Sequence, residues 1–312
     1  MPTAESDSRA EIAVAANRGE VVPDSPSEMT ADNQSSTDPP SARKAGSVGE
    51  LLVVAVPLVI SSGSLSLMHV VDRIMLTWHS EAALAASTPA GMLHWTLMSF
   101  AYGTVAYVNT FVAQYDGAGR RDRVAASVWQ GVWMALAAGL LLAAATPWSR
   151  ELIGWFRHAP DVEQLERAYF QVLSFGSIPA LLSAGLSAFF SGRGRTVVLM
   201  VVNAIISAAN VAINAVLIFG WGPFPALGIA GAAWGTVLAQ GLGCLLYVVW
   251  MLRDSEARQY PFRQQQRIEG RLLGRMLRYG MPNGVQYLVD IGAYLLLLVF
   301  IGRIGSQELA AT

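Results

Sequence analysis

Residues 51–76 read LLVVAVPLVISSGSLSLMHVVDRIML, an apolar stretch that carries His69, Asp72 and Arg73 close to its end. A hydrocarbon core of about 30 Å requires roughly 20 apolar residues in helix, so this stretch is long enough to cross a membrane. An acid inside such a helix costs at least about 2.5 kcal/mol on insertion scales. Asp72 therefore indicates a functional site, unless it lies near the interface and pairs there with an arginine.

The composition places the whole chain in a bilayer. Hydrophobic residues make up 53% of the 312 residues and charged residues 14%, whereas soluble proteins average about 25% charged residues. Runs such as LLVVAVPLVI lack the strict alternation of a membrane barrel, so the expected fold class is all-α, a polytopic membrane protein. The predicted membrane-spanning helices cover residues 51–76, 84–114, 124–147, 168–191, 196–220, 226–252 and 276–302.

The basic residues in the tail and in the connections between spans predict how the chain is oriented in the membrane. Residues 1–46 are rich in Ser, Pro, Asn and Asp and have no long apolar run, which predicts a disordered tail without a cleavable signal peptide. When alternate connections are assigned to the two sides, most arginines fall on the side of this tail. The tail is therefore expected in the cytoplasm. The basic, partly amphipathic segment 253–275 is expected to lie along the cytoplasmic headgroups.

An internal repeat relates the first span to the last. A shift of 225 residues superposes Gly49 on Gly274, Leu52 on Leu277, Pro57 on Pro282, and the tripeptide LAA at 84–86 on that at 309–311. The second copy begins six spans after the first, an even number, so the repeat is parallel, as in the two-bundle arrangement of some secondary transporters. The second copy reaches only Thr312, which predicts one complete bundle and the start of a second.

Several motifs in order resemble the multidrug and toxic compound extrusion (MATE) family of cation-coupled efflux transporters. The resemblance covers about residues 48–312 and implies two six-helix lobes around a central cavity. The domains expected are a tail (1–46), a first six-helix lobe (47–252), a cytoplasmic amphipathic linker (253–275) and the truncated start of a second lobe (276–312). One departure is Arg73, which replaces a small residue of the family motif. The matching motifs are PLVISSGSLSLMHVVDRIML with ALAAS, FVAQYDGAG, SAFFSGRGRT, NVAINAVLIFG, FPALGIAGAAWGTVLA and YGMPNGVQYLVDIG through IGRIGSQELAA.

Two acids are candidate ion-coupling sites. On a helix, Asp72 shares a face with His69, its expected local partner, whereas Arg73 points about 100° away. The resemblance implies that this aspartate couples transport to protons or sodium ions. Asp290 lies eight residues past Pro282 and is therefore expected nearer mid-membrane than Asp72, and no basic residue between Arg278 and Arg303 offers it a local partner. The resemblance gives Asp290 a role in coupling too; the alternative is a hydrogen-bonded acid that faces another helix.

A polar stripe marks the fifth span. Asn203, Ser207, Asn210 and Asn214 are spaced 4, 3 and 4 residues apart, so they share one helix face. They either line a cavity or make interhelical hydrogen bonds, worth about 0.6 kcal/mol each on average. The resemblance implies that Asn210 and Asn214 contribute to a first-lobe polar site, although some relatives carry Asp at the second position. Further candidates for the same cavity are Thr236, Asn109 and Gln114.

The sequence and the resemblance together predict a cation-coupled antiporter that exports amphipathic or cationic organic compounds across the inner membrane by alternating access. No enzyme activity, metal or cofactor is expected beyond a coupling proton or sodium ion. The expected partners are a small-molecule substrate, the lipid bilayer and a missing carboxy-terminal half, and no nucleic acid. One alternative is a flippase for lipid-linked oligosaccharides, disfavoured because only Arg73 and Arg303 are basic near membrane depth. The other is an inactive membrane fragment.

Overall fold

The computed structural model describes residues 48–304, and all regular structure within that range is helical, with no strand. The predicted tail (1–46) and the second LAA tripeptide lie outside the described residues. The helices are α3 (Val48–His79), α4 (Glu81–Ala106), α5 (Val108–Gly117), α6 (Arg121–Ala144), η1 (Thr146–Trp148), α7 (Ser149–Gly154), α8 (Pro160–Ser191), α9 (Thr196–Phe219), α10 (Ile229–Arg253), η2 (Ala257–Gln259) and α11 (Gly270–Ile304).

The long helices confirm an all-α, polytopic membrane fold. Five candidate spans are long and apolar enough to cross a bilayer. They correspond to α3, α6 with its continuation to Gly154, α8, α9 and α10. The two other predicted spans are also helical: α4 continues into α5 after a single turn residue, Tyr107, and α11 extends over 35 residues. α4 carries buried polar side chains such as His94 and Ser99, and α11 carries arginines in its first turns.

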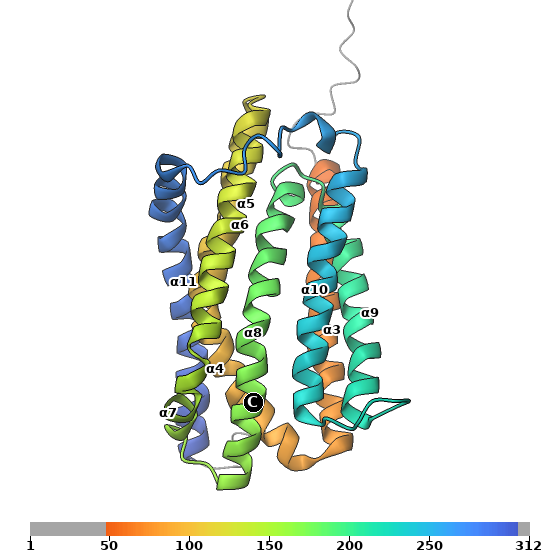
Figure 1. Cartoon of the computed structure of the whole chain (residues 1–312), viewed down its shortest axis with the longest axis vertical. Coiled ribbons are helices and arrows are strands. Elements are labelled where there is room, and N and C mark those ends of the chain that lie inside the picture. The colour runs from red at the N-terminus through yellow and green to blue at the C-terminus, as the bar shows by residue number, and fades with distance from the viewer. Residues whose placement is uncertain (1–47, 305–312) are drawn as a thin grey trace, which may run out of the picture. The chain divides into compact units, whose positions relative to one another are not determined.

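α8 occupies the middle of the bundle, where it packs against α4, α6 and α10. α9 packs on α10, and α11 packs on α4 (Figure 1). The connections that follow α5, α8 and α10 all lie at one end, which agrees with the predicted alternation of the spans (Figure 1). This arginine-rich end brings together residues 120–123, 193–195 and 253–278. α3 and α11 run in the same direction, as a parallel repeat requires.

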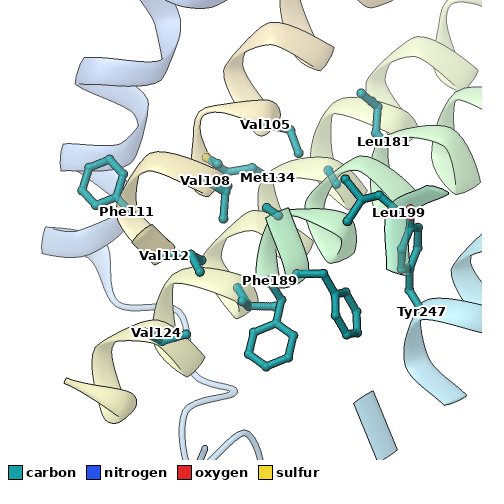
Figure 2. Close-up of a cluster of buried hydrophobic side chains, with 14 of the residues drawn as sticks. Val105, Val108, Phe111, Val112, Val124, Met134, Leu181, Phe189, Leu199 and Tyr247 are labelled. Carbon is teal, nitrogen blue, oxygen red and sulfur yellow. The ribbon is translucent and has the colours of Figure 1, made fainter. Parts of the chain in front are cut away.

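The largest cluster of buried apolar side chains joins α4, α5, α6, α8, α9 and α10. Figure 2 shows representatives from each of these helices, among them Val105, Phe111, Val124, Phe189 and Tyr247. The outward faces are apolar as well, with exposed Val53, Val59, Leu141 and Leu245. Because lipid is the solvent there, exposed apolar side chains are expected on a bundle that spans a membrane.

Exposed tryptophans gather at the end opposite the arginines. Trp78 closes α3, Trp148 and Trp155 lie in the connection between α6 and α8, and Trp221 follows α9. Tryptophan is enriched at membrane–water interfaces because its ring is apolar and its N–H group is polar. The four side chains therefore mark the second interface of the bundle.

The segment between α10 and α11 is held against α6 through its own backbone. Trp129 Nε1 donates to the carbonyl of Phe262 (2.8 Å), Trp133 Nε1 to that of Gln266 (2.9 Å) and Gln130 Nε2 to that of Arg267 (3.0 Å). Apart from η2, this segment is not helical, and the side chain of Tyr260 is buried in the large apolar cluster. The predicted linker thus packs on the bundle, while its contact with headgroups stays a prediction.

Candidate functional site

The polar stripe of α9 faces α3, and three hydrogen bonds join the two helices. Asn203 Nδ2 donates to Ser61 Oγ (2.6 Å), Ser207 Oγ donates to the carbonyl of Ser64 (3.0 Å), and Asn214 Nδ2 donates to Asp72 Oδ1 (2.6 Å). The partners are separated by 142, 143 and 142 residues. This nearly constant offset means that α3 and α9 run parallel and in register over the whole stripe.

The stripe ends in a hydrogen-bonded chain that crosses three helices. Asn214 Nδ2 also donates to Asn210 Oδ1 (3.2 Å), and Asn210 Nδ2 donates to Thr236 Oγ1 of α10 (3.3 Å). Both asparagines are fully buried, and Asp72 and Thr236 are half-buried. We refer to Asp72, Asn210, Asn214 and Thr236 as the polar cluster. The structure thus brings together one predicted ion-coupling acid and three predicted cavity residues.

The polar cluster contains an oxygen that lacks a partner. Asn214 Oδ1 is buried and accepts no hydrogen bond from any residue that the structure describes. It lies directly over Gly235 of α10, where an added Cβ would collide with it. A buried carbonyl oxygen without a donor costs free energy. Beside the Asp72 carboxylate, this oxygen can accept a proton donor or contribute to the coordination of a cation.

His69 is not the partner of Asp72, contrary to the sequence prediction. Its side chain is exposed, and none of the hydrogen bonds found among the described residues joins it to Asp72. The physical reason is that Asp72 turns toward α9, where Asn214 offers a donor, whereas His69 lies on the uncovered side of α3. Arg73 is exposed, as expected for a side chain that points away from Asp72.

Asn109 and Gln114 do not line the polar cluster, so their assignment to the same cavity is wrong. Asn109, on α5, instead borders a separate hollow of about 110 Å³ between α4, α5 and α8. Gln114 is exposed near the end of α5. The cause is the position of α5, which packs on α4, α6, α8 and α11 rather than on α9. The other residues that line the hollow are Tyr102, Ala106, Ala184, Ser187, Ala188 and Ser191.

Asp290 is exposed on α11 within the part of the chain that the structure describes, so its depth in the membrane and its role in ion coupling stay predictions. Its helix packs chiefly on α4, so most of the α11 surface has no neighbour among the described residues. Asp72 belongs to the α3–α9 pair instead. The structure therefore does not bring the two predicted ion-coupling acids into one cluster.

Sequence reasoning missed three residues that build the site. Ser61 and Ser64 are the α3 partners of the stripe. Ser64 follows Ser61 by 3 residues and Asp72 follows Ser64 by 8, so all three lie on one helix face. That spacing was a usable signal. Gly235 leaves room for Asn214, but only the packing of α9 on α10 reveals this role.

Comparison with known proteins identifies the family. The family model described as MatE matches residues 57–216, just over half of the chain. The chain belongs to the MatE family. The matched region contains Asp72 and the entire α9 stripe, whereas Thr236 and Asp290 lie beyond it.

Curated relatives are similar in sequence over most of the chain. A probable multidrug resistance protein NorM of Synechocystis sp. is 30% identical over 266 residues, which cover 84% of this chain and 57% of the relative. The probable NorM of Rhizobium meliloti is 29% identical, over 83% of this chain and 56% of the relative. The chain therefore spans just over half the length of these relatives.

Solved structures show the same fold. A MOP superfamily transporter from Pyrococcus furiosus superposes with a TM-score of 0.72 at 19% identity, over 84% of this chain and 57% of that one. The eukaryotic MATE transporter AtDTX14 gives 0.71 at 17% identity, over 81% of this chain and 56% of that one. At these identities the likeness concerns the MATE fold alone, and it supports a multi-pass membrane protein.

Proposed function

We propose that this chain forms the ion-coupling bundle of a multidrug efflux antiporter, which exports amphipathic or cationic organic compounds across the inner membrane in exchange for protons or sodium ions. The curated relatives, which are named as probable multidrug resistance proteins, support the export of drugs. The arginine-rich end faces the cytoplasm in this proposal, because short cytoplasmic connections are enriched in basic residues.

The hydrogen bond between Asp72 and Asn214 carries the proposal. A carboxylate within a membrane span is costly unless it is paired or functional, and no cation of the described residues pairs with Asp72. Its one observed partner is a neutral amide, which leaves the charge uncompensated. A proton or a sodium ion would supply the missing positive charge, and its departure would restore the ionised acid.

Oxygen atoms dominate the polar cluster, which bears on the coupling ion. The Asp72 carboxylate, the unpartnered Asn214 Oδ1 and the Thr236 hydroxyl are hard ligands of the kind that small, hard cations bind. Sodium would be bound by these oxygens directly, whereas a proton would reside on Asp72 alone. Asn214 is neutral, so Asp72 is the only acid that the polar cluster offers to either ion.

Asp290 would act in a second site. An ionised side chain on a lipid-facing surface is unfavourable, so the side of α11 that carries Asp290 is expected to be covered in the working transporter. In this proposal the cover is a carboxy-terminal half, either continuous with the chain or supplied by another polypeptide. Alternating access then rocks the two bundles against each other.

Efflux of ethidium from cells that express the protein tests the proposal. Asp72→Asn keeps the shape of the side chain and removes the charge, so we expect efflux to fall to background. The matched control is Asp122→Asn, an exposed acid outside the polar cluster, and it should transport as the parent does. Wild-type efflux by Asp72→Asn at equal expression would remove Asp72 from the mechanism.

The same assay separates the transporter from an inactive fragment. Cells that express only the 312-residue chain should be compared with cells that also express a carboxy-terminal half taken from one of the curated relatives. Efflux only in the second case supports the coupling-bundle proposal and assigns the second half to a partner. Absence of efflux in both cases, with both proteins in the membrane, would favour the fragment.

A further inference from the structure

Three exposed arginines form a stripe on the first turns of α11. Arg271, Arg275 and Arg278 are spaced 4 and 3 residues apart, so they lie on one side of the helix. The buried residues of these turns, Leu272, Met276 and Gly280, face the bundle. The arginine stripe thus points away from the bundle over two helical turns.

Most acids of this end already have partners. Glu269 pairs with Arg123 at 2.8 Å, and Asp254 and Glu256 pair with Arg193 and Arg195. Those pairs neutralise the acids nearest to α11 in the sequence. The arginine stripe makes no ion pair with the residues that the structure describes.

One member of the stripe has a fixed side chain. Arg275 Nη2 donates to the hydroxyl of Tyr115 on α5, at 2.5 Å. The remaining donors of its guanidinium are available, since the side chain is exposed. Arg275 therefore positions positive charge at a defined place beside α5, and it does so without neutralising that charge.

We expect the stripe at the depth of lipid headgroups. α11 has 35 residues, whereas about 20 suffice to cross the hydrocarbon core, and its first turns carry the arginines that are unfavourable inside the core. Along the same side of the helix, the arginines are followed by exposed Met281, Val285 and Val289. The surface of α11 thus changes from cationic to apolar along its axis, as a phospholipid changes from headgroup to acyl chain.

We propose that the arginine stripe and the apolar residues after it form a binding site for an anionic phospholipid. The guanidinium groups of Arg271, Arg275 and Arg278 bind the phosphate, for which arginine has the matching bidentate geometry. An acyl chain lies along Met281 and Val285. Zwitterionic lipid is disfavoured, because no acid of the described residues lies within the stripe to pair with its ammonium group.

Native mass spectrometry of the whole 312-residue chain in neutral detergent tests this site. Phosphatidylglycerol and phosphatidylcholine with identical acyl chains are titrated in parallel, and the bound lipids are counted. We expect phosphatidylglycerol to bind at least about tenfold more tightly, since each arginine near a membrane surface contributes on the order of 1 kcal/mol, which is about fivefold in affinity. The triple variant Arg271→Gln, Arg275→Gln, Arg278→Gln should lose this preference.

The matched control neutralises three exposed arginines of the same end that lie outside the stripe, in Arg253→Gln, Arg258→Gln, Arg263→Gln. It should keep the preference for phosphatidylglycerol. Equal losses in both triple variants would overturn the proposal, because the preference would then reflect the overall charge of this end. Undiminished preference in the stripe variant would also overturn it.

Two further experiments control for misfolding of the glutamine variant and for binding of free anions. The triple arginine-to-lysine variant of the stripe keeps the charge but not the bidentate geometry, so it should retain a weakened preference even if the glutamine variant fails to fold. Complete loss of preference in a folded lysine variant contradicts the site. Inorganic phosphate is added as a competitor. Complete displacement of phosphatidylglycerol by phosphate at equal concentration would show a site for free anions instead of a lipid site.

Discussion

Asp72 of α3 and Asn214 of α9 are 142 residues apart in the sequence, and their side chains meet at 2.6 Å inside the bundle. The amide donates one hydrogen to the carboxylate and the other to Asn210, while its own oxygen stays unpartnered among the described residues. Asn214 thus orients Asp72 without neutralising it. This arrangement is the physical basis for a coupling cation at Asp72.

The hydrogen bond between Asp72 and Asn214 should be stronger than the others between α3 and α9. Double-mutant cycles with Asp72→Ala and Asn214→Ala are expected to give a coupling energy of about 2 kcal/mol, since hydrogen bonds to charged groups exceed neutral ones. The cycle of Ser61→Ala and Asn203→Ala should give about 0.6 kcal/mol. Denaturant unfolding in mixed micelles measures both, and equal coupling energies would mean that Asp72 carries no charge.

Gly235 is expected to control the position of Asn214. Gly235→Ala places a methyl group where Asn214 Oδ1 lies, so we predict a loss of stability of about 1–3 kcal/mol, as in other overpacked sites. The control is Gly241→Ala in the same helix, where an added Cβ meets nothing within 4 Å. The thermal midpoint in detergent should fall only in the first variant. A similar midpoint in both would show that α9 and α10 can separate at no cost.

The sequence predicted the α9 stripe well, because a period of 3.6 residues is visible in one helix without knowledge of its neighbours. The residues of α3 that bind the stripe could not be predicted from the sequence in the same way. Ser61 and Ser64 are common in membrane helices, and only the parallel contact of α3 with α9 gives them a role. For Asp290 the sequence predicts only a depth in the membrane, because hydropathy reports the position of a residue along a span and not which helix covers it.

The connection between α10 and α11 illustrates a second limit. Trp129 and Trp133 bind backbone carbonyls of this segment, and a backbone carbonyl has no signature in the sequence. Its basic composition predicted an interfacial linker and gave no hint of this docking. The ion pairs of Arg193 with Asp116 of α5 and with Glu256 of the α10–α11 connection depend on the fold in the same way.

Arg193 should hold the arginine-rich end together. Its side chain is only 6% exposed and lies among Asp116, Asp254 and Glu256, with its guanidinium over the rings of Phe189 and Tyr260. Since removal of one member of a buried ionic network leaves charges uncompensated, Arg193→Gln should cost about 3 kcal/mol.

Hydrogen–deuterium exchange measures the local consequence of Arg193→Gln. Amides of residues 254–269 should exchange faster in this variant. An exposed arginine of the same segment gives the control, Arg258→Gln, which should exchange as the parent does. Unchanged protection in Arg193→Gln would show that the tryptophan hydrogen bonds alone hold the segment.

Alkaline pH should loosen the same segment through Tyr260. Burial raises the pKa of Tyr260, and its hydrogen bond to Asp116 Oδ1 (2.5 Å) raises it further. A folded-state pKa above the unfolded value of about 10 means that this stabilisation is complete below about pH 10 and is lost as the pH rises through the folded-state pKa.

Thermal unfolding as a function of pH measures this contribution. Tyr260→Phe should be less stable than the parent at neutral pH, and the difference should shrink at strongly alkaline pH. Tyr294→Phe, in an exposed position, is the control and should follow the parent throughout. A difference between Tyr260→Phe and the parent that does not depend on pH would assign the effect to packing.

Infrared difference spectroscopy of the Asp72 carboxyl group tests the central claim most directly. Spectra of the purified protein are recorded as the pH is lowered and as sodium is added, with Asp72→Asn as the reference. The account predicts a carboxyl or carboxylate band that responds to protons or sodium, is absent from Asp72→Asn and is shifted in Asn214→Ala. Identical responses in the parent and in Asp72→Asn would mean that no cation binds at Asp72 and would contradict the proposed coupling site.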